Sequence, residues 1–327
     1  MKASAFMSVF YHSSYVCPTA DSARPTHCLW SDDPYLSSRL LAAIASEAVN
    51  RGLPVCGEYH PMMPSLLVGL EVNGIGNFTA SPSTLPKGAK LIDCTVLASK
   101  DTLPSDELQP IARQKQALTE SIGQIGACLQ AQTELCKSLS APMVRTEELT
   151  QKAMRIAQKI KGGCNSQRTV PICGNHGTDE VYRLPFGEEV KIIGIEGQYH
   201  LPELFLDALL AALSERTCEY VILENALTQR QMGVWLPTEG RCYLLRAPED
   251  LCQSQLSLGR YLTPYTQSHR HNQRILQSAY KAWQDRLAMT VSEYQFLCEK
   301  EEALYAPLYK NDRLQSFRKR LLIDLFC

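Results

Sequence analysis

The sequence lacks the features that most directly assign a function. Its 33 Lys and Arg residues and 34 Asp and Glu residues leave a formal net charge of −1, so no overall positive field would attract nucleic acid or an anionic membrane. No apolar run approaches the length that crosses a bilayer. No C-x-x-C pair and no G-x-S-x-G elbow occurs in the chain. Nucleic acid and membrane are therefore not expected partners.

The 13 cysteines are numerous, but they do not form a disulfide pattern. Their number is odd, their spacing is irregular, and several lie inside predicted strands or helices. Cysteines of this kind are typical of reduced core residues in a cytoplasmic protein. The opening run is a poor signal peptide because serines and tyrosines interrupt it. Cys164, Cys173 and His176 would begin a zinc site, but no fourth ligand accompanies them.

The first half of the chain has an α/β pattern. THCLWS (26–31) predicts a short strand and is followed by a polar loop. An amphipathic helix is predicted from about Tyr35 to Arg51, and Gly52 ends it. LPVCGEYH (53–60) and several further short strands follow as far as residue 97.

The second half repeats this order after about 164 residues. KIIGIEG (191–197) corresponds to THCLWS, and the helix that follows corresponds to the first helix. CEYVILEN, QMGVWLP and RCYLLRA match LPVCGEYH, LVGLEVN and NFTAS in the same order. The alternative is that any two α/β segments look alike at this level of comparison.

The pattern between and after the halves is helical. Two helices, at about 106–140 and 146–161, are predicted to form an antiparallel hairpin. The Gly-rich and Pro-rich segment 162–187 is predicted to be a linker, and further helices are expected at about 268–304 and from 312 onward. The predicted division is a first lobe at 1–161 that includes the hairpin at about 105–161, a linker at 162–187 and a second lobe at 188–327.

Neither strand-to-helix loop has the residues of a standard phosphate loop. Such a loop uses glycine amides, a lysine and a magnesium-binding hydroxyl. The first loop has Asp32, Asp33 and Pro34 instead, and an aspartate N-cap with Pro34 at the first helical position explains these residues. The remaining candidates for a vestigial nucleotide site are Ser37, Ser38, Gly194, Gly197 and His200.

The run SSRLLAAIASEAVNRGLPVCGEYHPMMPSLLVGLEV resembles a segment of an uncharacterised bacterial family of duplicated P-loop ATPase-like proteins. The matching positions are Leu40, Leu41, Ile44, Arg51, Gly52, Tyr59, His60 and Gly69 in the first half, and Gly233, Val234 and Pro237 in the second. The resemblance implies two related P-loop NTPase-like lobes with helical hairpin insertions. The departures fall on the lysine and most of the glycines of both loops.

Three functions remain open at this point. The first is a catalytically degraded ATPase-like protein that acts as a scaffold or binds a protein partner and needs no cofactor. The second is an active nucleotide-binding protein that holds ATP and magnesium through Gly194, Gly197 and His200. The third is an unrelated enzyme with a pocket near Glu58, Tyr59 and His60, which lie at a predicted strand end.

Overall fold

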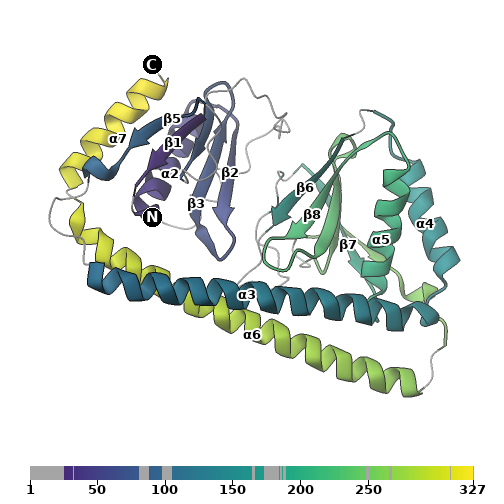
Figure 1. Cartoon of the computed structure of the whole chain (residues 1–327). Helices are drawn as coiled ribbons and strands as arrows, with labels where there is room; N and C mark the ends of the chain where they lie inside the picture. The colour runs from purple at the N-terminus through teal and green to yellow at the C-terminus, as the bar shows by residue number, and fades with distance from the viewer. Residues whose placement is uncertain are drawn as a thin grey trace. The chain divides into compact units, whose positions relative to one another are not determined.

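The fold is mixed α/β and contains two sheets (Figure 1). This computed structural model describes residues 26–31, 33–80, 88–97, 105–163, 166–172, 184, 186, 189–247, 251–264, 267–309 and 311–326. The chain divides into unit 1, residues 1–117, 185–187 and 293–327, and unit 2, residues 118–184 and 188–292. The units differ from the predicted lobes because most of the 105–161 segment belongs to unit 2 and residues 293–327 belong to unit 1.

Unit 1 has a five-stranded sheet in the order β2-β3-β4-β1-β5. Its elements are β1 (Thr26–Trp30), α2 (Pro34–Asn50), β2 (Val55–His60), β3 (Met63–Val72), β4 (Gly76–Thr79) and β5 (Lys90–Asp93). Strand β1 runs parallel to β4 and β5, whereas β2, β3 and β4 form an antiparallel meander. The apolar face of α2 is buried in the core with Leu321 of α7 (Asn311–Phe326). Hydrophobic burial of this face therefore explains the predicted first helix.

Unit 2 has a six-stranded sheet in the order β11-β7-β10-β9-β8-β6. Its elements are β6 (Ser166–Ile172), β7 (Lys191–Glu196), α5 (Leu201–Ser214), β8 (Glu219–Asn225), β9 (Gln231–Leu236), β10 (Arg241–Leu245) and β11 (Ser254–Ser257). Strand β7 runs parallel to β10 and β11, and β8, β9 and β10 form an antiparallel meander. Helix α4 (Thr146–Gln158) contributes Leu149, Ala153 and Ala157 to the core that α5 shares with this sheet.

Without β6, the two sheets have the same strand order and the same strand directions. The five segments matched in the sequence lie at equivalent positions, and β1 and β7 are both interior strands. The agreement extends to the register. One row of paired residues across unit 1 is Glu58, Gly69, Thr79, Cys28 and Leu91. The corresponding row in unit 2 is Leu223, Gly233, Leu244, Gly194 and Gln255.

The register also shifts at the same place in both sheets. The pairing of β2 with β3 shifts directly after Glu58, and the pairing of β8 with β9 shifts directly after Leu223. Both residues belong to the rows described above. The two sheets thus share a local irregularity as well as a strand order.

Both helices of the predicted hairpin exist, but the predicted packing of one on the other is wrong, because each packs on a different helix. Helix α3 (Ser105–Ser140) lies beside α6 (Gln267–Tyr305) in unit 2, where the Gln132 amide donates to the Leu276 carbonyl at 2.9 Å. Helix α4 packs on α5 instead (Figure 1). The amphipathic pattern of α3 specifies an apolar face but not the element that covers it.

The predicted linker is also corrected in part. Residues Ser166–Ile172 form β6, which pairs in parallel with β8 at an edge of the unit 2 sheet. Pro171 is compatible with this position because a proline can be accommodated in an edge strand.

Four basic residues near the end of the chain lie on a solvated helix face. Arg313, Arg318, Lys319 and Arg320 are exposed on α7, whereas Leu321 is buried. Among the described helices, none is long and apolar enough to span a membrane.

Gly126 allows α3 to approach the turn between β8 and β9 within unit 2. A Cβ atom at Gly126 would lie 2.6 Å from the Leu227 carbonyl oxygen, whereas a Cβ at Gly123 on the same helix would meet nothing within 4 Å. Backbone atoms cannot move aside as a flexible side chain can. The glycine is therefore required by the packing of the helix and not by its conformation.

Replacing Gly126 with alanine should reduce the free energy of unfolding by about 1–3 kcal/mol through overpacking. Gly123→Ala is the matched control and should raise the free energy of unfolding by up to about 1 kcal/mol, because alanine favours the helix. Urea denaturation of both variants measures the difference. Equal effects of the two substitutions would show that the close approach at Gly126 has no energetic weight.

Candidate functional site

The candidate site in each unit is the end of the sheet where the central parallel strand finishes and the following helix begins. We call this end the carboxyl edge of the sheet. Strand β1 leads into α2, and β7 leads into α5. The carboxyl ends of parallel strands and the amino end of the following helix are the common place for ligands in α/β proteins. The residues at these two edges are therefore the first candidates for a binding site.

In unit 1, the first loop is organised around a buried aspartate. Asp33 is 2% exposed, and its Oδ1 atom accepts a hydrogen bond from the Tyr35 amide at 2.8 Å. Asp33 is the N-cap of α2 with Pro34 at the first helical position, as predicted. Burial raises the pKa of Asp33, although hydrogen bonds from the Tyr309 hydroxyl and the backbone oppose that shift. Asp32 lies outside the described residues.

The two candidate serines of this loop hold α2 against the sheet. The buried Ser37 hydroxyl donates to the Leu29 carbonyl in β1 at 2.8 Å. The buried Ser38 hydroxyl oxygen accepts from the Leu67 amide in β3 at 2.9 Å. Both hydroxyls therefore form internal hydrogen bonds that a magnesium ion or a phosphate would have to replace.

The predicted pocket residues Glu58, Tyr59 and His60 lie in β2 at the same end of the sheet. The His60 ring stacks on Tyr294 of α6 with 5.8 Å between the centroids, and its Nδ1 atom accepts from the Met62 amide at 3.3 Å. Burial and the nearby Lys115 lower the pKa of His60 to about 4. The imidazole is therefore uncharged at neutral pH and packs against Tyr294.

Side chains of α6 and α3 cover the first turn of α2 within unit 1. The Tyr35 hydroxyl donates to the Cys298 carbonyl at 2.8 Å and lies 3.2 Å from Glu301. The same glutamate pairs with Lys115 of α3 at 2.6 Å, and both side chains of this pair are largely buried. The helix end that would face a phosphate in a nucleotide-binding protein is thus in contact with protein.

In unit 2, both candidate glycines serve close packing. A Cβ at Gly194, inside β7, would lie 2.9 Å from the Cys252 Sγ atom. A Cβ at Gly197 would lie 3.2 Å from the Pro202 ring. Neither observation points to contact with a ligand.

The loops at this edge contain unusual backbone conformations. Four described non-glycine residues have positive φ angles between 49° and 56°: Tyr199, His200, Gln229 and Arg246. They follow the carboxyl ends of β7, β8 and β10, which all lie at the same edge of the unit 2 sheet. Conformations of this kind cost free energy and persist only where the surrounding structure determines them, which is frequent at functional sites.

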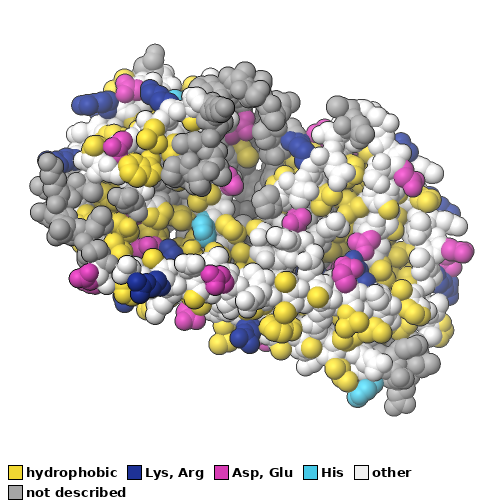
Figure 2. Space-filling model, viewed as in Figure 1, with side chains coloured by type: hydrophobic (Ala, Val, Ile, Leu, Met, Phe, Trp, Pro, Cys, Tyr) yellow, Lys and Arg dark blue, Asp and Glu magenta, His cyan; other side chains and the backbone are white. Residues whose placement is uncertain are grey.

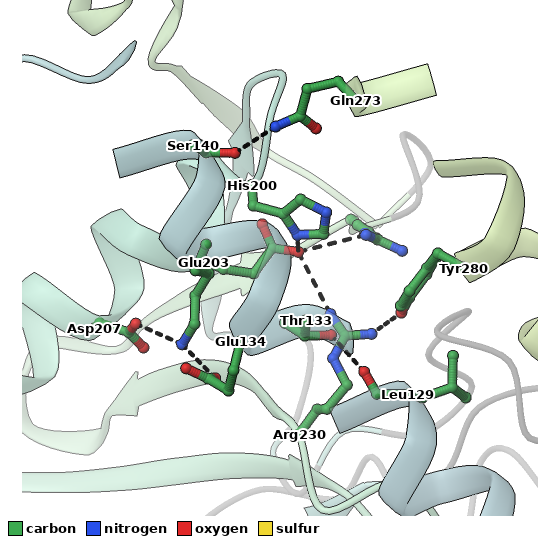
Figure 3. A network of polar contacts seen from close by, with 12 residues as sticks. Leu129, Thr133, Glu134, Ser140, His200, Glu203, Asp207, Arg230, Gln273 and Tyr280 are labelled. Carbon is green, nitrogen blue, oxygen red and sulfur yellow. Dashed lines mark hydrogen bonds and ion pairs between the residues drawn. The ribbon is translucent and has the colours of Figure 1, made fainter. Parts of the chain in front are cut away.

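A cluster of charged side chains occupies this edge (Figure 3). The Glu203 carboxylate, in the first turn of α5, lies 3.3 Å from His200 Nδ1. The same oxygen atom lies 3.4 Å from an Nη atom of Arg230 and 3.4 Å from an Nη atom of Arg246. Tyr280 of α6 contacts both arginines, since Arg230 is hydrogen-bonded to its hydroxyl and both guanidinium groups lie over its ring. We call Glu203, His200, Arg230 and Arg246 the α5 cluster.

The α5 cluster is charged at neutral pH. Burial alone would raise the pKa of Glu203, but His200, Arg246 and Arg230 lower it to about 2. Burial alone would lower the pKa of His200, but hydrogen bonds with Cys136 and Glu203 raise it to about 9. Three cationic groups therefore surround one carboxylate at the start of α5.

Sequence reasoning identified His200 but not the rest of the cluster. Glu203, Arg230, Arg246 and Tyr280 come from the helix, two loops and α6, and no spacing motif connects them. The one available signal was that an arginine closely follows β8 and another directly follows β10 in the repeat.

Comparisons with protein-family models, with curated proteins and with solved structures found no match to this chain. Among the described residues, no group of three or more His, Cys, Asp or Glu side chains is arranged to hold a metal ion. Cys164, Cys173 and His176 lie outside those residues. The geometry of the two sheet edges is therefore what bears on function.

The stability of unit 2 should fall as the pH rises above neutrality. The pKa of His200 is about 9, above the ordinary value of 6.5, so its contribution is complete below pH 6.5 and is lost as the pH rises through 9. We expect wild-type protein to lose up to about 3 kcal/mol more than His200→Asn between pH 6 and 9.5. Asparagine tolerates the left-handed backbone at this position without titrating.

Urea denaturation at both pH values tests this expectation. His60 does not interfere because its pKa is lowered and its contribution changes only below pH 6.5. Parallel stability profiles for the wild type and the variant would rule out a charged His200 in the folded protein.

Proposed function

We propose that this chain is a duplicated P-loop ATPase-like protein that no longer binds ATP and acts in the cytoplasm as a scaffold or as a partner-binding protein. The observation that carries the proposal is that, in each unit, the helix after the central parallel strand begins with a buried carboxylate of the chain. These carboxylates belong to Asp33 and Glu203.

The matching registers of the two sheets support duplication. Gly69 and Gly233 occupy the same position in the two rows. At both positions a Cβ would lie within 3 Å of another atom, Glu58 Oε2 for Gly69 and the Tyr243 carbonyl oxygen for Gly233. The close contact at Gly233 is to the backbone and that at Gly69 is to a side-chain end, so the shared feature is a glycine at the same register position, which is consistent with descent of both units from one ancestor.

The charges of the loops support the loss of ATP binding. Two unit charges of the same sign at about 4 Å repel by about 4 kcal/mol at an effective dielectric constant near 20. A triphosphate in front of α2 would meet Asp33, whereas one in front of α5 would have to displace the Glu203 carboxylate from the three cations that it pairs with. Pro34 and Pro202 also lack the amide hydrogens that a phosphate loop uses.

Exposed apolar side chains on unit 2 support a partner-binding role. On α6, Ile275 is 56% exposed and Met289 is 74% exposed, and on α3 Leu135 is 51% exposed. Figure 2 shows hydrophobic side chains along the region of α3 and α6. The nine described cysteines are all free thiols, which accords with a reducing compartment such as the cytoplasm.

A second candidate function is ATP binding with magnesium at unit 2. It is favoured by the positive charge of His200, Arg230 and Arg246 at the start of α5. Cationic side chains and a helix amino terminus are the usual elements of a phosphate site.

Isothermal titration with ATP and magnesium separates these functions. Wild-type protein should give no binding heat at millimolar nucleotide, because both loops present a carboxylate instead of a lysine. Micromolar binding that Arg246→Ala abolishes and Arg241→Ala retains would establish the second candidate. Arg241 is the matched control because it lies at the opposite end of β10.

The partner-binding role predicts a contact at the exposed apolar side of α6. A photoreactive amino acid in place of Met289 should give a discrete cross-linked species in cells, because exposed apolar side chains are preferred at protein interfaces. The same substitution at Gln277, an exposed polar position on the same helix, is the control. Equal cross-linking at both positions would argue against a specific interface on this side of α6.

A further inference from the structure

In the α5 cluster, three cations share one carboxylate. His200 comes from the loop before α5, Arg230 from the segment between β8 and β9, and Arg246 from the end of β10. All three approach the same oxygen atom of Glu203, whose side chain is 8% exposed. Asp207 on the same helix is 43% exposed and pairs with the single cation of Lys137.

We propose that the α5 cluster is an anion-binding site whose ligand is part of the chain: the Glu203 carboxylate fills a site that would otherwise hold a small oxyanion. The identification of this site with an ancestral phosphate site rests on the proposed function. The anion chemistry of the site does not.

The chemistry of the three cations fits an oxyanion. A guanidinium group offers several N–H donors in one plane, and these match the oxygen atoms of a carboxylate or a phosphate. The imidazolium of His200 adds a further donor, because its pKa is raised to about 9. The positive end of the α5 dipole adds to the attraction.

Two of the three cations, Arg230 and His200, are buried and require a charged occupant, whereas Arg246 is 40% exposed. Side-chain exposure is 4% for Arg230 and 7% for His200. Buried charges that lose their counter-charge are strongly destabilising. If the Glu203 carboxylate is removed, the cluster must therefore take up an anion, release the His200 proton or unfold.

The test is chemical rescue of Glu203→Ala by a free oxyanion in place of the missing carboxylate. Acetate and inorganic phosphate are added separately at constant ionic strength in place of chloride, and thermal unfolding is followed. The melting temperature of the variant should rise by roughly 5 °C and reach a plateau, as expected for binding to the folded state. Wild-type protein and the Asp207→Ala control should show no saturable rise.

Rescue by either oxyanion supports the proposal, and rescue by phosphate also supports a phosphate ancestry for the site. A Glu203→Ala protein that responds like Asp207→Ala, or that stays unfolded in both oxyanions, overturns the proposal. Glu203→Gln provides a second measurement because it keeps the side-chain volume. In that variant the pKa of His200, measured by NMR, should fall from about 9, and an unchanged value would also overturn the proposal.

The outcome is independent of the ATP titration of the wild type. Oxyanion rescue without ATP binding supports both proposals. If wild-type protein binds ATP, the proposed loss of nucleotide binding fails, whereas the rescue experiment still decides whether Glu203 occupies an anion site.

Discussion

The need to stabilise a buried carboxylate at the start of a helix governs both sheet edges. In unit 2, the Glu203 carboxylate pairs with cations from the loop before α5, from the segment between β8 and β9, and from the end of β10. His200 and Arg246, which have left-handed backbone conformations, both pair with this carboxylate. In unit 1, Asp33 is stabilised by neutral donors, a backbone amide and the Tyr309 hydroxyl. The two units thus stabilise a buried carboxylate at the same position of the fold with different groups.

The long helices α3 and α6 complete these edges. Tyr280 of α6 contacts the α5 cluster in unit 2, and Tyr294 of the same helix stacks on His60 in unit 1. Helix α3 contributes Cys136 to His200 and Lys115 to the edge of unit 1. Tyrosine suits this role since its ring packs against cations and apolar groups while its hydroxyl satisfies a buried polar partner. Side chains of α3 and α6 therefore contribute to the properties of both edges.

The sequence predicted local structure well because capping and periodicity are local properties. The Asp33 cap, the helix that follows it and the equivalence of β1 and β7 all follow from such patterns. The predicted packing of the hairpin was wrong because an amphipathic pattern indicates which face of a helix is buried and not which element covers it. Strand β6 was missed since its parallel partner β8 lies about 50 residues away. The α5 cluster could not be predicted, because its members meet only in the folded protein.

Unit 1 is built from distant parts of the chain, and this has a consequence for synthesis of the chain on the ribosome. Its sheet is made from residues before 100, yet its core includes Leu321 of α7, and α6 contacts Tyr35 through residues near 300. A chain that emerges from its amino end completes its domains as their last residues appear. All of unit 2 lies between these two parts in the sequence. The unit that is translated first is therefore the last to acquire its complete core, and until then α2 and its sheet expose apolar surface.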